Sequence, residues 1–357
     1  MTFEQARAQF PVLDRLAYLQ AGSAGPLARA TTEAIQAEVE RDLRDGRSGS
    51  VYIERVLALR EELRTALAGL VSVAPQQVAL TSSTTDGCNV VLAGLDLTPE
   101  DEVLTTTDEH FGLIGPLHTS GAHVVVVPPD PDAIVAAVTP RTRLLALSQV
   151  LWTTGHALPV HELRARTGVP ILVDGAQSAG AIEVDARGLD FFTISGQKWL
   201  CGPESTGALV VGDPERLRVA RPSYLSQQRH DPDGSFEPWP GARRFDPHWI
   251  PVAFMSGLLA ALATRPVWGF ERALDTAERC RARLLDEGLD VVSPPRQATL
   301  VTWRHEGEET SAVVRRLLAA GIVVRDLPGT GLVRASVGWW TSDDDLERLV
   351  AGLRAQG

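Results

Sequence analysis

The sequence predicts an α/β protein with a large domain built on a mostly parallel sheet and a smaller α+β C-terminal domain. Two observations carry this prediction. Short, unbroken apolar runs recur between residues 78 and 211, separated by stretches long enough for crossover helices. Beyond residue 298 the pattern changes to strand, helix, two strands and helix, which is typical of a separate α+β unit.

The predicted large sheet is about seven-stranded, because seven such runs occur. The runs are continuous rather than alternating, so each strand is expected to be buried on both faces. Spacings of about 20 residues leave room for crossover helices between strands. The expected strands are residues 78–81, 102–106, 123–128, 143–148, 169–174, 190–195 and 207–211.

Helical and irregular segments surround this sheet. Residues 54–71 place leucine and valine side chains on one face of a helix. Residues 222–251 contain six prolines, which predicts a long irregular segment, and such segments are usually functional. A helical stretch is expected over residues 251–285.

The remaining elements belong to the smaller domain. Its last helix is opened by Ser342 and Asp343, which favour a helix N-terminus. The expected elements are a strand over 298–303, a helix from Ser311, strands over 322–325 and 331–337, and that last helix. We therefore expect a large domain over residues 15–255 and a small domain formed by residues 1–14 and 256–357.

Composition and charge exclude several classes of protein. The 357 residues are 44% hydrophobic with a net charge of −11, which suits a large core and disfavours nucleic acid or anionic membranes as partners. The first 14 residues lack a secretory apolar run, and residues 250–263 are too few to span a bilayer. Cys88, Cys201 and Cys280 lack metal-ligand spacing. We expect a cytoplasmic protein without a metal site.

A single lysine stands out among the basic residues. The 34 basic residues comprise 33 arginines and Lys198. Arginine keeps its proton in proteins and forms no imine with an aldehyde, whereas a lysine amine can do both. A lone lysine could also be a chance surface residue. However, Lys198 follows the expected strand 190–195 directly, at the edge where parallel sheets bind ligands.

Asp174 ends the expected strand 169–174 at the same edge of the sheet. Alone, it would more simply be a helix N-cap. A carboxylate and an amine on neighbouring strand ends, however, suit pyridoxal 5'-phosphate. The lysine would form an imine with the aldehyde, and the aspartate would keep the pyridine nitrogen protonated.

Other strand ends offer further polar contacts. The hydroxyl-rich run 82–87 precedes a helix and could bind a phosphate or simply cap that helix. Ser195 could add a hydroxyl, and His110 could lie flat on the cofactor ring, although a lone loop histidine is more often structural. Arg334 could hold a substrate carboxylate or form an interdomain ion pair. The chain has no P-loop, dinucleotide-binding glycine motif, nucleophile elbow or zinc-protease motif.

Two stretches carry a family resemblance: residues 173–185 read VDGAQSAGAIEVD, and residues 195–209 read SGQKWLCGPESTGAL. With residues 18–26 and 334–336, they resemble the class V aminotransferase family, whose members are fold-type-I enzymes that use pyridoxal phosphate. The family includes cysteine desulfurases, selenocysteine lyases and isopenicillin N epimerase-like proteins. The resemblance covers nearly the whole chain and implies fold type I and a homodimer.

The resemblance implies a role for each matching residue. Lys198 would carry the cofactor and move the proton at the substrate α-carbon, with Asp174 and His110 completing the catalytic set. Arg334 would bind the substrate α-carboxylate. Within the cofactor contacts, Gln177 would meet the phenolic oxygen. The implied cofactor contacts are Lys198, Asp174, Gln177, His110, Ala176, Thr84, Thr85, Ser195 and Gln197.

The chain also departs from the family pattern. Trp152, beside the expected substrate, stands where members commonly have Asn, and Gln197 stands where desulfurases often have His. Trp249 replaces a threonine that normally reaches the partner subunit, so Arg243 or Arg244 could supply that phosphate contact. Residues 324–331 lack the cysteine that desulfurases carry before the carboxylate-binding arginine.

These observations predict an enzyme acting at the α-carbon of an amino acid, which is its small-molecule substrate. A β-eliminating C–S lyase or a transaminase is expected, with an epimerase as one alternative and a non-catalytic cofactor-binding scaffold as another. The scaffold is disfavoured because binding alone needs no carboxylate clamp at Arg334. No nucleic acid, membrane or metal partner is expected.

Overall fold

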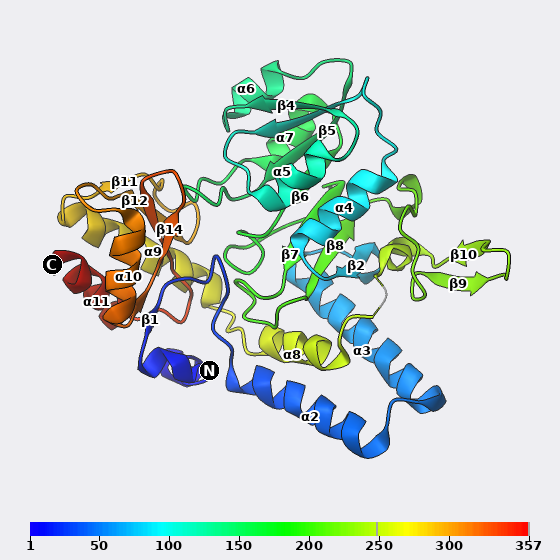
Figure 1. Ribbon diagram of the computed structural model, residues 1–357, viewed down its shortest axis with the longest axis horizontal. Helices are drawn as coiled ribbons and strands as arrows, with labels where there is room; N and C mark the ends of the chain where they lie inside the picture. The colour runs from blue at the N-terminus through cyan, green and yellow to red at the C-terminus, as the bar shows by residue number, and fades with distance from the viewer. Residues whose placement is uncertain (248, 356–357) are drawn as a thin grey trace.

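A seven-stranded sheet forms the centre of the computed structural model, which describes residues 1–247 and 249–355 (Figure 1). The strand order is β2-β8-β7-β6-β5-β3-β4. Only β8 runs antiparallel to its two neighbours, so the predicted mostly parallel sheet is confirmed. Its strands are β2 (Val78–Thr81), β3 (Glu102–Thr106), β4 (His123–Val127), β5 (Thr142–Ser148), β6 (Ile171–Asp174), β7 (Phe191–Ser195) and β8 (Gly207–Val211).

Helices cover both faces of this sheet, which is why most strands are continuous apolar runs. One face packs on α3 (Gly49–Leu70), α6 (Pro131–Ala136), α7 (Val160–Thr167) and α8 (Val252–Ala263). The other face packs on α4 (Thr84–Gly94) and α5 (Phe111–His118). The expectation of full burial is wrong for β4. This strand lies at the edge of the sheet and is partly exposed.

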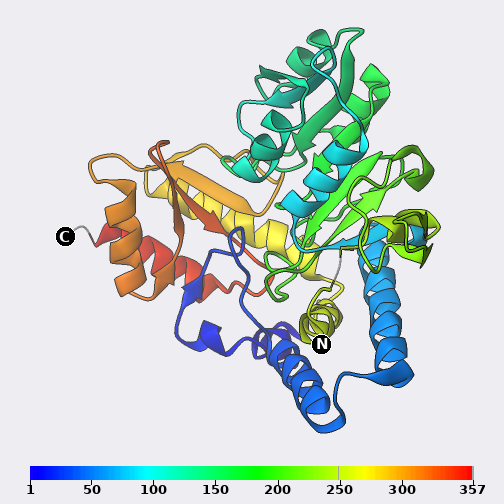
Figure 2. The ribbon, with the colours of Figure 1, turned by 45° about the vertical axis from the view of Figure 1, so that its right-hand side comes forward.

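A second, four-stranded antiparallel sheet has the order β11-β12-β15-β14. Its apolar face packs on three helices, and in Figure 2 the sheet and these helices form a distinct group beside the large sheet. The elements are β11 (Asp290–Val291), β12 (Leu300–Arg304), β14 (Arg325–Leu327), β15 (Leu332–Ser336), α9 (Gly269–Asp286), α10 (Thr310–Ala319) and α11 (Asp343–Arg354).

The N-terminal chain links the two sheets. Helix α1 (Phe3–Arg7) precedes β1 (Ala17–Tyr18), and β1 pairs in parallel with β13 (Ile322–Val323) of the small unit. The predicted strand 322–325 is divided, because β13 pairs with β1 whereas β14, which begins at Arg325, pairs with β15. Farther along, the Gly25 N–H donates to the carbonyl oxygen of Gln197 at 2.8 Å, beside Lys198. The domain division at residues 15 and 255 stays a prediction.

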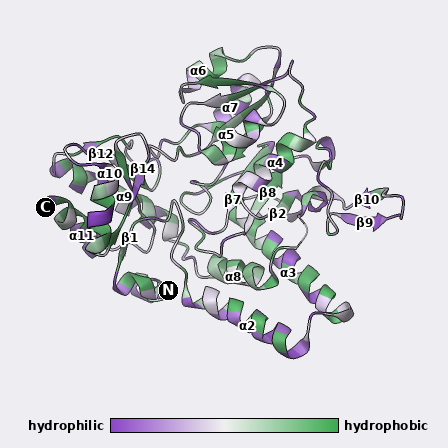
Figure 3. Ribbon diagram, in the orientation of Figure 1, coloured by the Kyte–Doolittle hydropathy of each residue, from purple (hydrophilic) through white to green (hydrophobic). Residues whose placement is uncertain are grey.

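Three segments differ from the predicted elements. Helix α2 (Arg29–Asp45), which the apolar pattern did not indicate, is largely polar in Figure 3 and packs along α8. The helical stretch 251–285 is broken near Pro266 into α8 and α9. The proline-rich segment contains an exposed hairpin of β9 (Gln227–His230) and β10 (Phe236–Pro238). In the described part of the chain, no helix is long and apolar enough to cross a membrane.

Candidate active site

Asp174 lies at the carboxyl end of β6, between the ends of β5 and β7. Its Oδ1 accepts hydrogen bonds from the Ala176 N–H at 2.9 Å and from the Thr193 hydroxyl at 3.3 Å. The carboxylate therefore caps a turn rather than an α-helix. It is only 3% exposed, which suits a carboxylate that pairs with a buried cationic group.

Lys198 follows β7, three residues beyond its last residue, Ser195. Burial lowers the pKa of the Lys198 amine to about 8; Asp174 opposes this shift, while Arg334 and Arg325 add to it. An amine with such a pKa is uncharged in a useful fraction near neutral pH, so it can act as a nucleophile or base. Gly25 packs so closely on this loop that a Cβ there would overlap the Lys198 carbonyl oxygen.

His110 caps α5 through its ring. Its Nδ1 accepts a hydrogen bond from the Gly112 N–H at 3.0 Å, which places the proton of the neutral ring on Nε2. Burial lowers the pKa of His110, and the charge of Lys198 lowers it further. The ring stands edge-on to Trp152, with centroids 5.2 Å apart. The structural and the cofactor-contact interpretations of His110 are compatible, because the cap leaves Nε2–H available.

The hydroxyl-rich segment begins α4, whose first residues are Thr84 and Thr85. Helix α4 starts at the carboxyl end of β2 and packs against β7. Ser195, at the end of β7, donates to Gln197 Oε1 at 2.8 Å. Hydroxyls and free N–H groups at a helix start form a site for an anion, so these residues fit a phosphate.

Gln177 is held from two sides. Its Nε2 donates to the Gly22 carbonyl oxygen at 2.9 Å, and its Oε1 accepts from the Trp199 indole at 3.0 Å. One amide hydrogen is left for a further acceptor, such as a phenolic oxygen. Ala176, directly before it, is 8% exposed. A Cβ on Gly22 would lie 2.8 Å from Arg334 Nη2 and 3.0 Å from Gln177 Oε1, so a larger residue there would displace these polar groups.

Arg334 is fully buried and reaches across from the small sheet. Its Nη1 donates to the Trp152 carbonyl oxygen at 2.6 Å. Its Nε and Nη2 have no partner in the described residues, nor do Ser336 Oγ and the Trp152 indole nitrogen. Burial lowers the pKa of Arg334 to about 9, and Arg325 adds to this effect. Unpaired buried donors around a guanidinium fit an anionic ligand better than an interdomain ion pair.

Glu109 is a buried carboxyl that the sequence interpretation did not single out. It accepts hydrogen bonds from the Ser148 N–H at 3.0 Å and from the Thr106 hydroxyl at 2.9 Å. Burial raises the pKa of Glu109 to about 7; the Ser148 and Thr106 hydrogen bonds oppose the shift, and Asp174 adds to it. Its position directly before His110, after a strand end, was the available signal.

The cysteines are placed where they cannot act as nucleophiles. Cys88, Cys201 and Cys280 are all buried. Burial raises the pKa of Cys201 and Cys280 to about 12, and that of Cys88 well above its usual value. The described residues also contain no group of three or more metal-ligating side chains. Residues 324–331 contain no cysteine. Because the three thiols are buried and have raised pKa values, they do not replace the sulfur-accepting cysteine of the desulfurases.

Arg243 and Arg244 lie on the segment that the resemblance connects with a partner subunit. The Arg243 guanidinium stacks on Trp239, 3.8 Å from the ring centroid. Arg244 pairs with Glu215 at 2.5 Å. In this single chain, each is thus engaged away from Thr84 and Thr85, and their contact with a phosphate stays a prediction.

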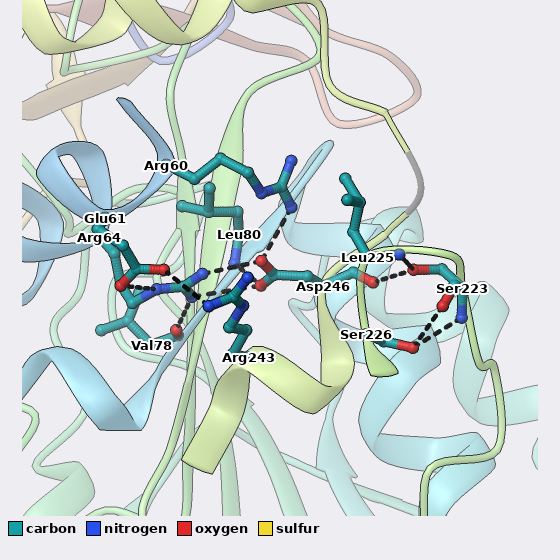
Figure 4. A network of polar contacts seen from close by, with 10 residues as sticks. All are labelled: Arg60, Glu61, Arg64, Val78, Leu80, Ser223, Leu225, Ser226, Arg243 and Asp246. Atoms are coloured by element: carbon teal, nitrogen blue, oxygen red, sulfur yellow. Dashed lines mark hydrogen bonds and ion pairs between the residues drawn. The ribbon is translucent and has the colours of Figure 1, made fainter. Parts of the chain in front are cut away.

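A buried ion cluster anchors this segment to the sheet. Asp246 pairs with Arg60 at 2.9 Å and Arg64 at 2.8 Å, and also accepts the Leu80 N–H at 2.9 Å (Figure 4). Burial acts to raise the pKa of Asp246, but the two arginines hold it below its usual value. Since Leu80 belongs to edge strand β2, the cluster covers that edge and steadies the strand that leads to α4.

The fold and site define an α/β enzyme with a half-buried lysine and a buried aspartate at the carboxyl edge of a mostly parallel sheet and an arginine from a second sheet. The sequence model of the aminotransferase class-V family matches residues 17–349. The chain belongs to this family of pyridoxal-phosphate enzymes, so the family resemblance is confirmed.

Individual relatives span nearly the whole chain. It is 28% identical to isopenicillin N epimerase of Streptomyces clavuligerus, covering 99% of this chain and 98% of that protein. It is 29% identical to the cysteine desulfurase CsdA of Escherichia coli strain K12, and the match covers 97% of this chain and 95% of that protein. A solved structure of the cystine C–S lyase C-DES with its product cysteine persulfide is 27% identical in sequence and has a TM-score of 0.91. The match covers 98% of this chain and 100% of the C-DES chain. The predicted fold type is thereby confirmed.

Proposed function

We propose that this protein is a C–S lyase that uses pyridoxal phosphate to eliminate a sulfur leaving group from the β-carbon of an amino acid. The observation that carries the proposal is the combination of Lys198, Asp174 and Arg334 at one site with a cysteine-free segment 324–331. Such a site can break a C–S bond but has no thiolate to accept the sulfur atom.

The residues fit the cofactor. The start of α4 and Ser195 would hold the phosphate, and the buried carboxylate of Asp174 would pair with the pyridine nitrogen. Pyridoxal phosphate, when bound, supplies an electron sink for a carbanion at the substrate α-carbon. The solved C-DES structure with glycine linked to this cofactor supports the assignment.

The chain's own groups then perform the proton chemistry. Arg334 would hold the substrate α-carboxylate through its unpaired Nε and Nη2, which orients the α-carbon. Lys198 Nζ, with its pKa of about 8, would take the α-proton. The sulfur leaves with the electron pair of the C–S bond, gains a proton and departs as a thiol or persulfide. The remaining three-carbon enamine takes up water and breaks down to pyruvate and ammonia.

We also infer that two copies of the chain associate. Exposed apolar side chains lie on α2, α3 and the segment after β8; they include Leu43, Val51, Ile53, Tyr224 and Trp249. Ile53, Tyr224 and Trp249 line one hollow, which suits a second copy better than water. Sedimentation of the purified protein tests this inference, because a monomer at micromolar concentration would contradict it.

The reaction is tested by product analysis. The protein loaded with pyridoxal phosphate is incubated with cystine, S-alkyl cysteines and ordinary amino acids, and a Lys198→Ala variant serves as the control. A lyase releases pyruvate and ammonia in equal amounts. A keto acid together with the pyridoxamine form of the cofactor would instead identify a transaminase, and inversion at the α-carbon an epimerase. Either result would replace the present proposal.

A further inference from the structure

Arg265 lies in the short connection between the two units of the fold. Helix α8 ends at Ala263 and packs in the core of the large sheet, whereas α9 begins at Gly269 and packs on the small sheet. Arg265 is half-buried at this connection. Its side chain reaches back to two loops of the large unit, and these loops carry Lys198 and Gln177. The residue therefore joins three segments that are far apart in the sequence.

The guanidinium of Arg265 holds two backbone carbonyl oxygens through separate nitrogens. Its Nη1 donates to the Trp199 carbonyl oxygen at 2.9 Å, and its Nη2 donates to that of Gly180 at 2.8 Å. Trp199 directly follows Lys198, and Gly180 lies shortly after Gln177. Because the guanidinium is planar and rigid, its two nitrogens fix these carbonyl groups relative to each other.

The same two loops are packed tightly against each other. Gly180 has a positive φ of 87°, and a Cβ there would lie 2.5 Å from Leu200 Cδ2 and 3.2 Å from the Trp199 carbonyl carbon. The Trp199 indole also donates to Gln177 Oε1 at 3.0 Å. An indole N–H can only donate, so it decides which end of the Gln177 amide is the oxygen. A displacement of Trp199 would thus move both the Lys198 loop and the Gln177 amide.

Packing alone does not account for an arginine at this position. The Arg265 guanidinium forms no ion pair within residues 1–247 and 249–355 and lies 5.0 Å from the centroid of the Phe270 ring. Burial lowers the pKa of Arg265 to about 10, and the nearby Cys201 opposes this shift. Taking a charge out of water without an opposite charge is costly, whereas an apolar side chain would fill the same space without this cost. What the arginine contributes is its two hydrogen bonds to carbonyl oxygens.

We propose that Arg265 is a positioning residue that holds the Lys198 amine in place relative to the Gln177 amide. It acts through the backbone of Trp199 and Gly180 rather than by contact with the reacting atoms. The proposal rests on the proposed cofactor link at Lys198 but not on the identity of the leaving group. Without the guanidinium, the two carbonyl oxygens would bond to water and the lysine loop would gain conformational freedom. The amine would then spend less time in the orientation that its covalent chemistry needs.

The test compares two substitutions of Arg265 with a matched control. Arg265→Met keeps an apolar stem but removes all donors, whereas Arg265→Lys keeps the charge without the rigid fork. The control is Arg272→Met. Arg272 likewise donates to two carbonyl oxygens, those of Trp339 at 3.1 Å and Thr341 at 3.2 Å. It also lies over an aromatic ring, that of Phe3, but all of these contacts are away from the lysine loop.

Release of pyridoxal phosphate from the loaded protein is the first measurement. After dilution, the decay of visible absorption gives the release rate. Arg265→Met should release the cofactor roughly tenfold faster than the wild type, the factor expected when hydrogen bonds of a charged group are lost. Arg265→Lys should fall between the two, and Arg272→Met should stay within about twofold of the wild type. Equal release rates for Arg265→Met and Arg272→Met would overturn the proposal, because Arg265 would then have no specific effect on the site.

Amine labelling separates this proposal from the proposed cofactor link. Lys198 and the α-amino group are the only primary amines of the wild-type chain, so mass spectrometry can follow acylation of the cofactor-free chain at each. The ratio of the two rates should change roughly tenfold in Arg265→Met and less than about twofold in Arg272→Met. A changed ratio in a chain without a borohydride-reducible link at Lys198 would refute the cofactor link but support the role of Arg265. An unchanged ratio would overturn that role. If Arg265→Met does not fold, as judged by thermal unfolding, Arg265→Gln takes its place.

Discussion

The replacement Glu109→Gln should make the protein's stability less sensitive to pH. The pKa of Glu109 is raised from 4.5 to about 7 because its carboxyl is buried. A shift of this size corresponds to about 3 kcal/mol of differential stability between the two protonation states. Because the folded form prefers the protonated carboxyl, this stability is present below pH 4.5 and is lost as the pH rises through 7.

Glutamine keeps the shape and most hydrogen bonds to Ser148 and Thr106 but cannot ionise. The difference in unfolding free energy, variant minus wild type, should therefore increase by up to about 3 kcal/mol between pH 5 and pH 8. Urea unfolding at four pH values across this range measures it. Glu100→Gln, at an exposed position, is the control and should give a constant difference. A constant difference for Glu109→Gln as well would refute the reasoning.

Three further substitutions test other parts of the structure. Lys198→Arg keeps the positive charge but should abolish the covalent link to the cofactor and all turnover. Borohydride reduction followed by peptide mapping tests for the covalent link. A labelled peptide from the variant would contradict the assignment of Lys198. Gly22→Ala should raise KM for the amino acid by roughly tenfold, because its Cβ would lie 2.8 Å from Arg334 Nη2. An unaltered KM would show that the loop relaxes. Asp246→Ala removes the buried ion-pair partner of Arg60 and leaves Arg64 paired only with Glu61. It should destabilise the protein by about 3–5 kcal/mol, measured by urea unfolding, and a loss below about 1 kcal/mol would show that the cluster is solvated.

The large sheet could be predicted because a strand that is buried on both faces is a continuous run of apolar residues in the sequence. Continuous apolar runs end at Asp174 and Ser195, and the confirmed parallel sheet brings these two ends to the same edge. The lysine was identifiable for a chemical reason, since arginine fills every other basic position. Polar caps, glycine and proline also mark most helix ends, although α2 escaped notice because its faces are largely polar.

Other features depend on segments that are distant along the chain. The edge position of β4 depends on strand order, which an apolar run does not record. The opposition of Arg325 and Arg334 depends on the register of β14 and β15, and a one-residue slip would separate them. The amide of Gln177 is fixed by Gly22, 155 residues away. The types of residue available for chemistry were thus determined locally by the sequence, whereas their distances and unpaired donors were decided by tertiary contacts, because charge and hydrogen bonding act through space rather than along the chain.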